Sequence, residues 1–192
     1  MKGNVLVLIF GAILTLGFFS GCDYDSVISQ ERAAEGFDGI ALAGAGDVNV
    51  HFSENFNVIV TTDSDLQDKV VTAVEGNTLR ITQRSRSFNA RELTIDVYMP
   101  ELKSISLTGA GDIKINGGNA SRLDIALSGA GDIKAHNFQV QNVTVKHSGV
   151  GDVKIWATNT LTGNLSGVGD ILYRGSPRIN INRTGVGKIR PL

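Results

Sequence analysis

One pentapeptide dominates the sequence: glycine, alanine or valine, glycine, then aspartate or lysine and a β-branched residue. It occurs six times, and from the second copy onward the copies begin 20, 20, 18 and 18 residues apart. A fixed period is the mark of a repeat architecture in which each unit stacks on the next. A βαβ unit needs about 30 residues, so this period leaves room only for short strands and turns. The copies begin at Gly44, Gly109, Gly129, Gly149, Gly167 and Gly185.

Apolar and polar residues alternate after each copy, which predicts short strands with one buried face. In one coil, for example, Ile133 and Ala135 alternate with polar residues, and Val143 and Val145 do so again after a bend. We therefore expect an all-β fold, a single-stranded right-handed parallel β-helix with about 18–20 residues per coil. Each strand pairs with its equivalent in the next coil at about 4.8 Å, so equivalent residues form rows. Glycine suits the stacked corners, where a turn through positive φ favours it.

The amino terminus resembles the signal of a bacterial lipoprotein. A basic residue, Lys2, precedes an apolar run over residues 5–19, which is shorter than the roughly 20 residues of a membrane span. The sequence Phe19-Ser-Gly-Cys22 resembles a lipobox, and this implies cleavage before Cys22 and lipidation of its sulfur. We expect residues 1–21 to be the signal peptide and Cys22 to anchor the protein in the bacterial cell envelope, at the inner or outer membrane. Two or three acyl chains give stable anchoring.

The remaining residues divide into a tether and one domain. We assign residues 22–36 to the lipidated cysteine and a polar tether, and residues 37–192 to the β-helix. Within it, residues 48–107 have longer and less regular spacing and are expected to form an irregular amino-terminal β cap. Such a cap would cover an edge that is otherwise prone to aggregation. Residues 108–192 form the regular coils.

A stretch at the start of the regular coils resembles a known family. Pro100-Glu-Leu-Lys-Ser-Ile-Ser-Leu-Thr-Gly-Ala-Gly-Asp112, followed by Gly-x-Gly-Asp repeats, is similar to the head GIN domain family of auto-transporter adhesin heads. Gly76-Asn-Thr-Leu79 also matches, and the resemblance covers about residues 37–189. It implies a β-helix carried by bacterial lipoproteins. It implies no catalytic residue and no particular ligand.

The acidic residues of the pentapeptide should form a row with carboxylates about 4.8 Å apart. Neighbouring carboxylates at this distance repel by roughly 1 kcal/mol even in a water-like dielectric, so something must compensate. We favour a structural answer, in which lysines two residues later and backbone amides of the corner neutralise the row. The alternative is bound Ca²⁺, although Ca²⁺-binding β-rolls have a nine-residue repeat. The acids are Asp112, Asp132, Asp152 and Asp170, and the lysines are Lys114, Lys134 and Lys154.

A second row, seven residues after the first glycine of each copy, is the candidate binding surface. It combines the only tryptophan with polar residues, an arrangement that can hold a sugar ring or a peptide. The alternative is a set of cross-strand pairs that only stabilises the sheet. The candidate residues are Asn116, His136, Trp156 and Arg174, with His51 at the equivalent position of the first copy.

Composition and motifs exclude several functions. The 18 basic and 19 acidic residues argue against a nucleic-acid partner, and one cysteine excludes an internal disulfide or a cysteine-cluster metal site. No Gly-x-Ser-x-Gly, phosphate loop or His-Glu-x-x-His motif occurs. His147 stands where other coils have leucine, and we expect it to be buried and hydrogen-bonded rather than a catalytic base.

We therefore expect a cell-envelope lipoprotein with a non-enzymatic domain, without a cofactor, in a binding, adhesion-like or structural role. Its expected partners are the membrane, through the lipid anchor, and an envelope protein or glycan. One alternative is a carbohydrate-active enzyme, since pectin-cleaving enzymes share the β-helix shape, although fold alone does not transfer activity. The others are a Ca²⁺-binding β-solenoid and a self-associating scaffold.

Overall fold

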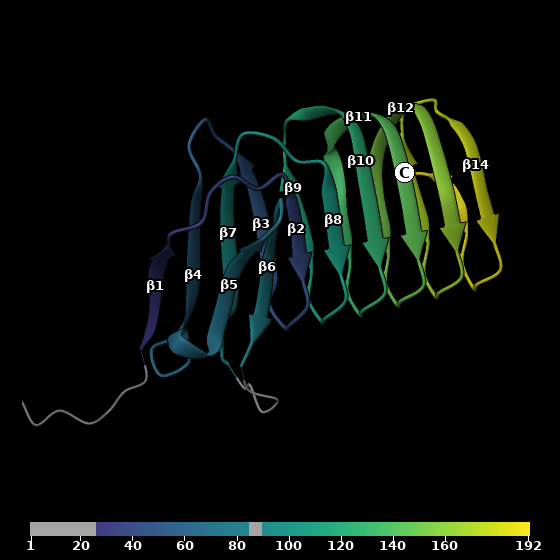
Figure 1. Cartoon of the computed structure of the whole chain (residues 1–192). Helices are drawn as coiled ribbons and strands as arrows, with labels where there is room; N and C mark the ends of the chain where they lie inside the picture. The colour runs from purple at the N-terminus through teal and green to yellow at the C-terminus, as the bar shows by residue number, and fades with distance from the viewer. Residues whose placement is uncertain (1–25, 85–89) are drawn as a thin grey trace, which may run out of the picture.

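The computed structural model describes residues 26–84 and 90–192 (Figure 1). The expected signal peptide, Cys22 and the first residues of the tether lie outside these ranges. Fifteen strands join into one sheet, and the only helical element of the described residues is a single 3₁₀ turn, η1 (Gln67–Lys69). The all-β prediction is confirmed. No helix in the described ranges is long and apolar enough to cross a membrane.

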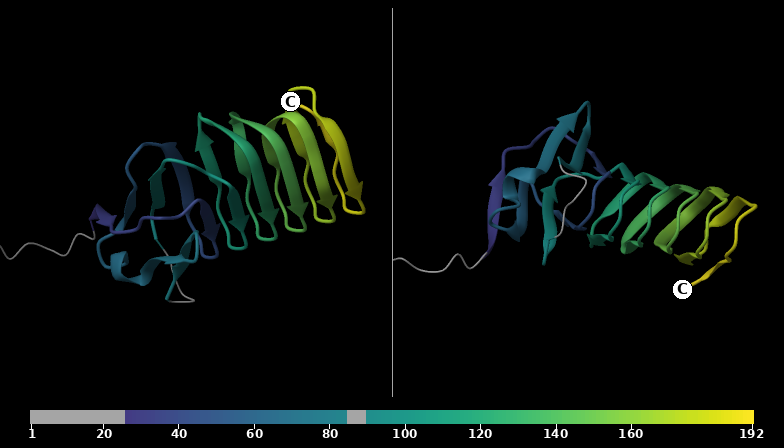
Figure 2. Two further views of the ribbon diagram at one scale, coloured as in Figure 1. Left: turned by 45° about the horizontal axis from the view of Figure 1, so that its top comes forward. Right: turned by 90° about the horizontal axis from the view of Figure 1, so that it is seen from below.

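The carboxy-terminal half winds as coils whose strands lie side by side in two walls (Figures 1 and 2). Neighbouring strands here pair in parallel, and equivalent residues are 20 positions apart in the first coils and 18 in the last. For example, Leu127 pairs with His147, which pairs in turn with Leu165. One wall contains β8 (Ser104–Leu107), β10 (Asn119–Leu127), the later parts of β11 (Ile133–His147) and β12 (Val153–Leu165), and β14 (Arg178–Arg183). The other contains β9 (Ile113–Asn116), the first parts of β11 and β12, β13 (Ile171–Arg174) and β15 (Ile189–Pro191).

The regular register begins earlier than the sequence analysis expects. Strands β2 (Gly39–Leu42) and β3 (Asp47–Phe52) pair in parallel with β8 and β9, so that the corner between them stacks on the next one. The long gap between the first two pentapeptides is therefore an insertion within one coil. The expected cap boundary at residue 48 falls inside β3, because spacing alone does not show that the chain returns to the stack after the insertion.

The insertion extends both walls at the amino-terminal end of the stack (Figure 2). One inserted strand pairs in parallel with β3 and another with β2, and each then carries an antiparallel partner. For β5 and β6 the antiparallel pairing follows from the short connection Glu75-Gly-Asn-Thr78, which suits a hairpin. The inserted strands are β4 (Asn57–Asp63), β5 (Val70–Glu75), β6 (Thr78–Gln83) and β7 (Leu93–Met99).

Part of the expected tether is a strand. Val27–Arg32 form β1, which pairs antiparallel with β4 at the edge of the sheet. Its side chains are mostly exposed and show no apolar alternation, so the sequence carries no strand signal. Backbone pairing holds it instead, helped by Arg32, whose guanidinium donates to the side-chain and main-chain oxygens of Gln67 at 3.0 and 2.8 Å.

The two glycines of each pentapeptide are required for different reasons. At Gly129, a Cβ would lie 2.0 Å from the carbonyl oxygen of Gly109 in the preceding coil. Gly131 has φ of +143°, and its Cβ would lie 2.0 Å from the carbonyl oxygen of Gly111. Between them the backbone of Ala130 donates to Gly109 at 2.9 Å and accepts from Gly111 at 3.0 Å. The corners thus stack backbone on backbone, without room for side chains at either glycine.

The core lies between the walls and is built from rows of aliphatic side chains, one from each coil. The innermost row includes Leu42, Leu107, Leu127 and Leu165, all fully buried. An aromatic pair joins the first complete coil to the third: the rings of Phe52 and Phe138 stack with centroids 5.0 Å apart. These rows give the coils a common hydrophobic interior along the whole stack.

We predict that Gly131→Ala destabilises the protein by about 3 kcal/mol, because positive φ and a backbone clash act together. Gly76→Ala is the matched control: Gly76 also has positive φ, but no atom lies within 4 Å of its added Cβ. It should cost only about 1 kcal/mol. Urea unfolding of both variants measures the difference, and equal destabilisation would contradict the stacked-corner geometry.

Candidate functional site

The pentapeptide acids form a ladder that joins successive coils. In each step one carboxylate oxygen accepts a hydrogen bond from the backbone N–H of the equivalent residue in the next coil, at 2.8–2.9 Å. The ladder begins with Asp47, which the sequence analysis left out of the row because its copy stands 65 positions before the next. Its steps are Asp47–Asp112, Asp112–Asp132, Asp132–Asp152, Asp152–Asp170 and Asp170–Lys188.

Basic side chains neutralise the ladder unevenly. Lys134 forms an ion pair with Asp112 of the preceding coil and lies 3.9 Å from Asp132 of its own coil. Burial acts to raise the pKa of Asp112, but the Lys134 ammonium and the Asp132 amide together hold that pKa below its usual value. At the last step the backbone N–H of Lys188 and the guanidinium of Arg190 lower the pKa of Asp170.

This geometry favours the structural reading of the acids. One oxygen of each carboxylate is occupied by the next coil's amide, so each coil has one oxygen left for a cation or a basic side chain. Among the residues the structure describes, no three His, Cys, Asp or Glu side chains gather as a metal ion would need. The ladder connects coil to coil in the way that a capping side chain satisfies an orphaned backbone N–H.

We predict that Asp132→Ala lowers the free energy of unfolding by about 1–2 kcal/mol, because the Asp152 N–H loses its acceptor. Asp132→Asn keeps an oxygen there and should change stability by less than about 0.5 kcal/mol. Thermal unfolding of both variants, with and without Ca²⁺, tests the assignment. A melting temperature of the wild type that rises saturably with Ca²⁺ would instead support a cation-binding ladder.

Stability should also fall in acid. The pKa values of Asp63, Asp112 and Asp170 are lowered in the folded state, so their ionised forms stabilise it. This contribution is fully present above the unfolded value of about 3.9 and is lost as pH falls through the lower folded values. Urea midpoints between pH 6 and pH 2 should show a smaller acid loss for Asp112→Asn than for the wild type. The control is Asp65→Asn, at an exposed residue, and its urea midpoints should change with pH as those of the wild type do.

The structure pairs the candidate binding residues in two separate groups. The guanidinium carbon of Arg174 lies 4.2 Å from the centre of the Trp156 ring, a cation–π contact between adjacent coils. Asn116 pairs instead with His51, on the neighbouring strands β9 and β3. His136 pairs with neither, since Gln139 occupies the position opposite Trp156.

A bulge in β11 explains why His136 leaves the row. Ala135 and Gln139 pair with two consecutive residues of β12, so β11 has three extra residues between them. Shortly afterwards β12 has one extra residue relative to β11. The net difference of two residues is the change from a 20-residue to an 18-residue coil. The bulge turns Phe138 into the core, where it is fully buried. Sequence spacing shows the two-residue change but not where the chain absorbs it.

A polar cluster beside Asn116 has no counterpart in the sequence analysis. Asp96 on β7 accepts from Asn49 at 3.1 Å and contacts His51 Nε2 at 3.2 Å, while the His51 ring stacks on Tyr98 at 4.8 Å between centroids. All four side chains are half-buried on the outer face of β3 and β7. They come together because the insertion returns in parallel beside the first coil, a pairing that residue spacing does not predict.

His147 is buried, as expected, but only half hydrogen-bonded. Its side chain has no solvent exposure and occupies the leucine row. Nε2–H donates to the carbonyl oxygen of Gly151 at 2.6 Å, whereas Nδ1 has no partner. Nδ1 lies close to the backbone of Gly167, which excludes a larger residue there. This ring is enclosed by the coil and has no access to a substrate, which fits a structural histidine.

The repeat that builds the corners and the ladder is also the part of the chain that a known family shares. A profile described as "Putative auto-transporter adhesin, head GIN domain" matches residues 36–117 and 110–177, well over half of the chain. The chain belongs to this family. The resemblance to this family, which was inferred from the glycine repeats, is confirmed. The same repeats form the stacked corners and the carboxylate ladder. No curated protein matches the sequence.

The chain of this head GIN domain protein was also compared with solved structures. A protein from Bacteroides fragilis named "a putative adhesin" is 23% identical, with a TM-score of 0.62 over 87% of this chain and 97% of that one. A "putative lipid binding protein" from Parabacteroides distasonis is 21% identical, with a TM-score of 0.46 over 88% of this chain and 98% of that one. The first of these shows that the arrangement of strands recurs in another bacterial protein.

Proposed function

We propose that this protein is a non-enzymatic binding module of the bacterial cell envelope, with an adhesion-like role, held at the membrane through Cys22. The observation that carries the proposal is the pair Trp156 and Arg174, an aromatic face and a guanidinium fixed on adjacent coils. Membership of a family described as adhesin heads supports the same role.

We further infer that residues 37–192 form a single-stranded right-handed parallel β-helix interrupted by one inserted cap. Parallel pairing between residues one coil apart supports this assignment, as do five consecutive bridges between the corners. A stack of this kind resists bending because each coil is bonded to both neighbours. It would hold binding residues in fixed positions, which reduces the entropy lost when a partner binds.

The lipid anchor gives the stack an orientation. Residue 26 lies at the β1 end and the carboxy terminus at the opposite end of the stack (Figure 2). An anchor at Cys22, five residues before β1, would therefore place the amino-terminal cap near the membrane. The coils that carry Trp156 and Arg174 would project away from it toward an envelope protein or a glycan.

The enzyme alternative rests on the cluster of Asn49, His51, Asp96 and Tyr98. A histidine oriented by a carboxylate is a common general base, and this pair is the observation that favours a carbohydrate-active enzyme. It lies on a half-buried sheet face, however, and an apolar hollow lies elsewhere, over β8 and β10. We therefore place binding before catalysis.

We predict that Trp156→Ala weakens binding of the full-length protein to isolated envelope glycans at least tenfold, because a ring lost from the partner contact costs about 1.4 kcal/mol or more. Trp156→Phe keeps an aromatic face and should lose less than threefold. Glycan-array binding and calorimetry measure both variants, and cleavage of the glycans is monitored in parallel. Unchanged binding by Trp156→Ala would exclude this surface, and cleavage abolished by His51→Ala would support the enzyme alternative.

A further inference from the structure

The last corner of the stack has backbone donors that no coil covers. In the preceding corner the N–H of Gly169 donates to Val186 and that of Ile171 to Lys188, both at 2.9 Å. Each such N–H points toward the following coil. Among the described strands, β15 pairs only with β13. The equivalent N–H groups, of Gly187 and Ile189, therefore point out of the end of the stack.

The sign of the charge also changes at this corner. The last pentapeptide has Lys188 where the five others have aspartate, so the residue that would accept a further coil's amide is a cation. Residues 171–192 contain five basic residues and no acidic one, whereas residues 1–170 hold the other 13 basic residues and all 19 acidic ones. The carboxy-terminal coil is thus a strongly positive end on an acidic body.

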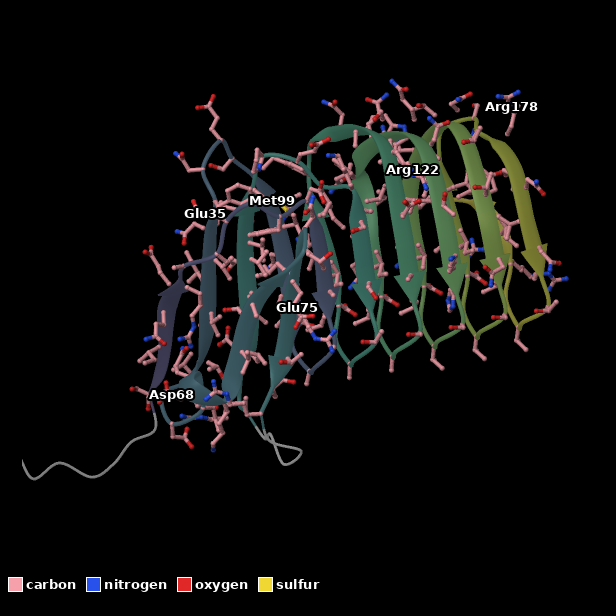
Figure 3. All side chains as sticks on the ribbon, viewed as in Figure 1. Glu35, Asp68, Glu75, Met99, Arg122 and Arg178 are labelled. Atoms are coloured by element: carbon pink, nitrogen blue, oxygen red, sulfur yellow. The ribbon has the colours of Figure 1, made fainter. Side chains whose placement is uncertain are left out.

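Three of these cations surround the open corner. An open pocket of about 660 Å³ at the end of the stack is lined by Arg183, Lys188 and Arg190, together with Asp170 and the corner glycines. Arg183 occupies the leucine row, and its guanidinium crosses the corner to donate to the carbonyl oxygen of Gly187 at 3.0 Å. Arg190 pairs with Asp170 at 3.0 Å, which leaves two cations uncompensated. Arg178 projects at the opposite edge and lies outside the pocket (Figure 3).

We propose that this terminal corner binds a phosphate group. Its oxygens would take the places that the next coil's carbonyl oxygens occupy in the inner corners, accepting from the N–H groups of Gly187 and Ile189. Lys188 and Arg183 supply charge that matches the 1.5 to 2 negative charges of a phosphate monoester near neutral pH. Backbone N–H groups that converge beside cations are a recurring anion site in proteins. The site is separate from the Trp156 surface and does not depend on the proposed function.

The phosphate can come from a soluble ester or from a lipid headgroup. Two apolar side chains at this end, Val186 and Leu192, are 71% and 62% exposed. Basic residues beside exposed apolar ones are typical of proteins that contact anionic bilayers. The experiment therefore includes both a soluble probe and vesicles.

The test uses inorganic phosphate and the full-length protein. Calorimetry should show saturable binding, and the amide NMR signals of Gly187 and Ile189 should shift with the same midpoint. Two variants restore residues that the inner coils already use, so both should fold: Lys188→Asp and Arg183→Leu. We expect each to weaken phosphate binding about tenfold or more. Lys146→Asp makes the same charge change on the exposed face of β11 and should keep wild-type affinity.

Binding that is equal in Lys188→Asp and the wild type would overturn the proposal, as would the absence of saturable binding up to about 10 mM phosphate. Vesicles of phosphatidylglycerol and of phosphatidylcholine then identify the source. Loss of phosphatidylglycerol binding in Lys188→Asp, with phosphate as a competitor, assigns the site to lipid headgroups. Equal vesicle binding by both proteins, beside the tenfold loss for soluble phosphate, assigns it to soluble esters. The amino-terminal apolar segment is common to all variants and cancels in the comparison.

Discussion

The contact on which the structure depends is the approach of one glycine corner to the next. From the second copy onward, a Cβ at either glycine would come within about 2 Å of a carbonyl oxygen of the preceding coil, and the second glycine has positive φ in all six copies. Once the corners stack, the apolar rows and the carboxylate ladder follow, because each coil must repeat the geometry of its neighbour. The corner allows one small outward side chain, and alanine in the first three copies gives way to valine in the last three.

Away from the corners, the stack tolerates changes in coil length. The insertion between β3 and β8 adds strands to both walls without disturbing the register of the corners on either side. The bulge in β11 places Phe138 in the core, and the net difference between β11 and β12 makes the later coils two residues shorter. The insertion also covers the first corner, where the Gln83 side chain accepts from the N–H of Ala45 and donates to its carbonyl oxygen, both at 2.7 Å. A repeat protein in which each unit contacts only its neighbours can absorb such differences locally.

Much of this architecture follows from spacing and alternation. The distance of 18–20 residues predicts parallel pairing one coil apart, and the leucine row at Leu107, Leu127 and Leu165 is predictable because its residues recur at that distance. The strand β1 is not predictable, since its residues are exposed and its pairing depends on a distant edge. The cluster of His51 and Asp96 is also hidden, because it joins residues from either side of an insertion whose return path no local pattern fixes.

The same repeat position can have different chemistry at different places in the stack. Inside the stack, the fourth residue of the pentapeptide is an acceptor for the next coil's amide, and aspartate supplies it. At the last corner that the structure describes, the corresponding residue is Lys188, and no backbone N–H of the described residues stands opposite it. Lys188 and Arg183 place two cations at this corner, where the inner coils have aspartate and either leucine or histidine. The bridge between Val168 and Val186 is kept at this corner, so the departures from the repeat change the charge of the corner and leave its backbone pairing with the preceding coil unchanged.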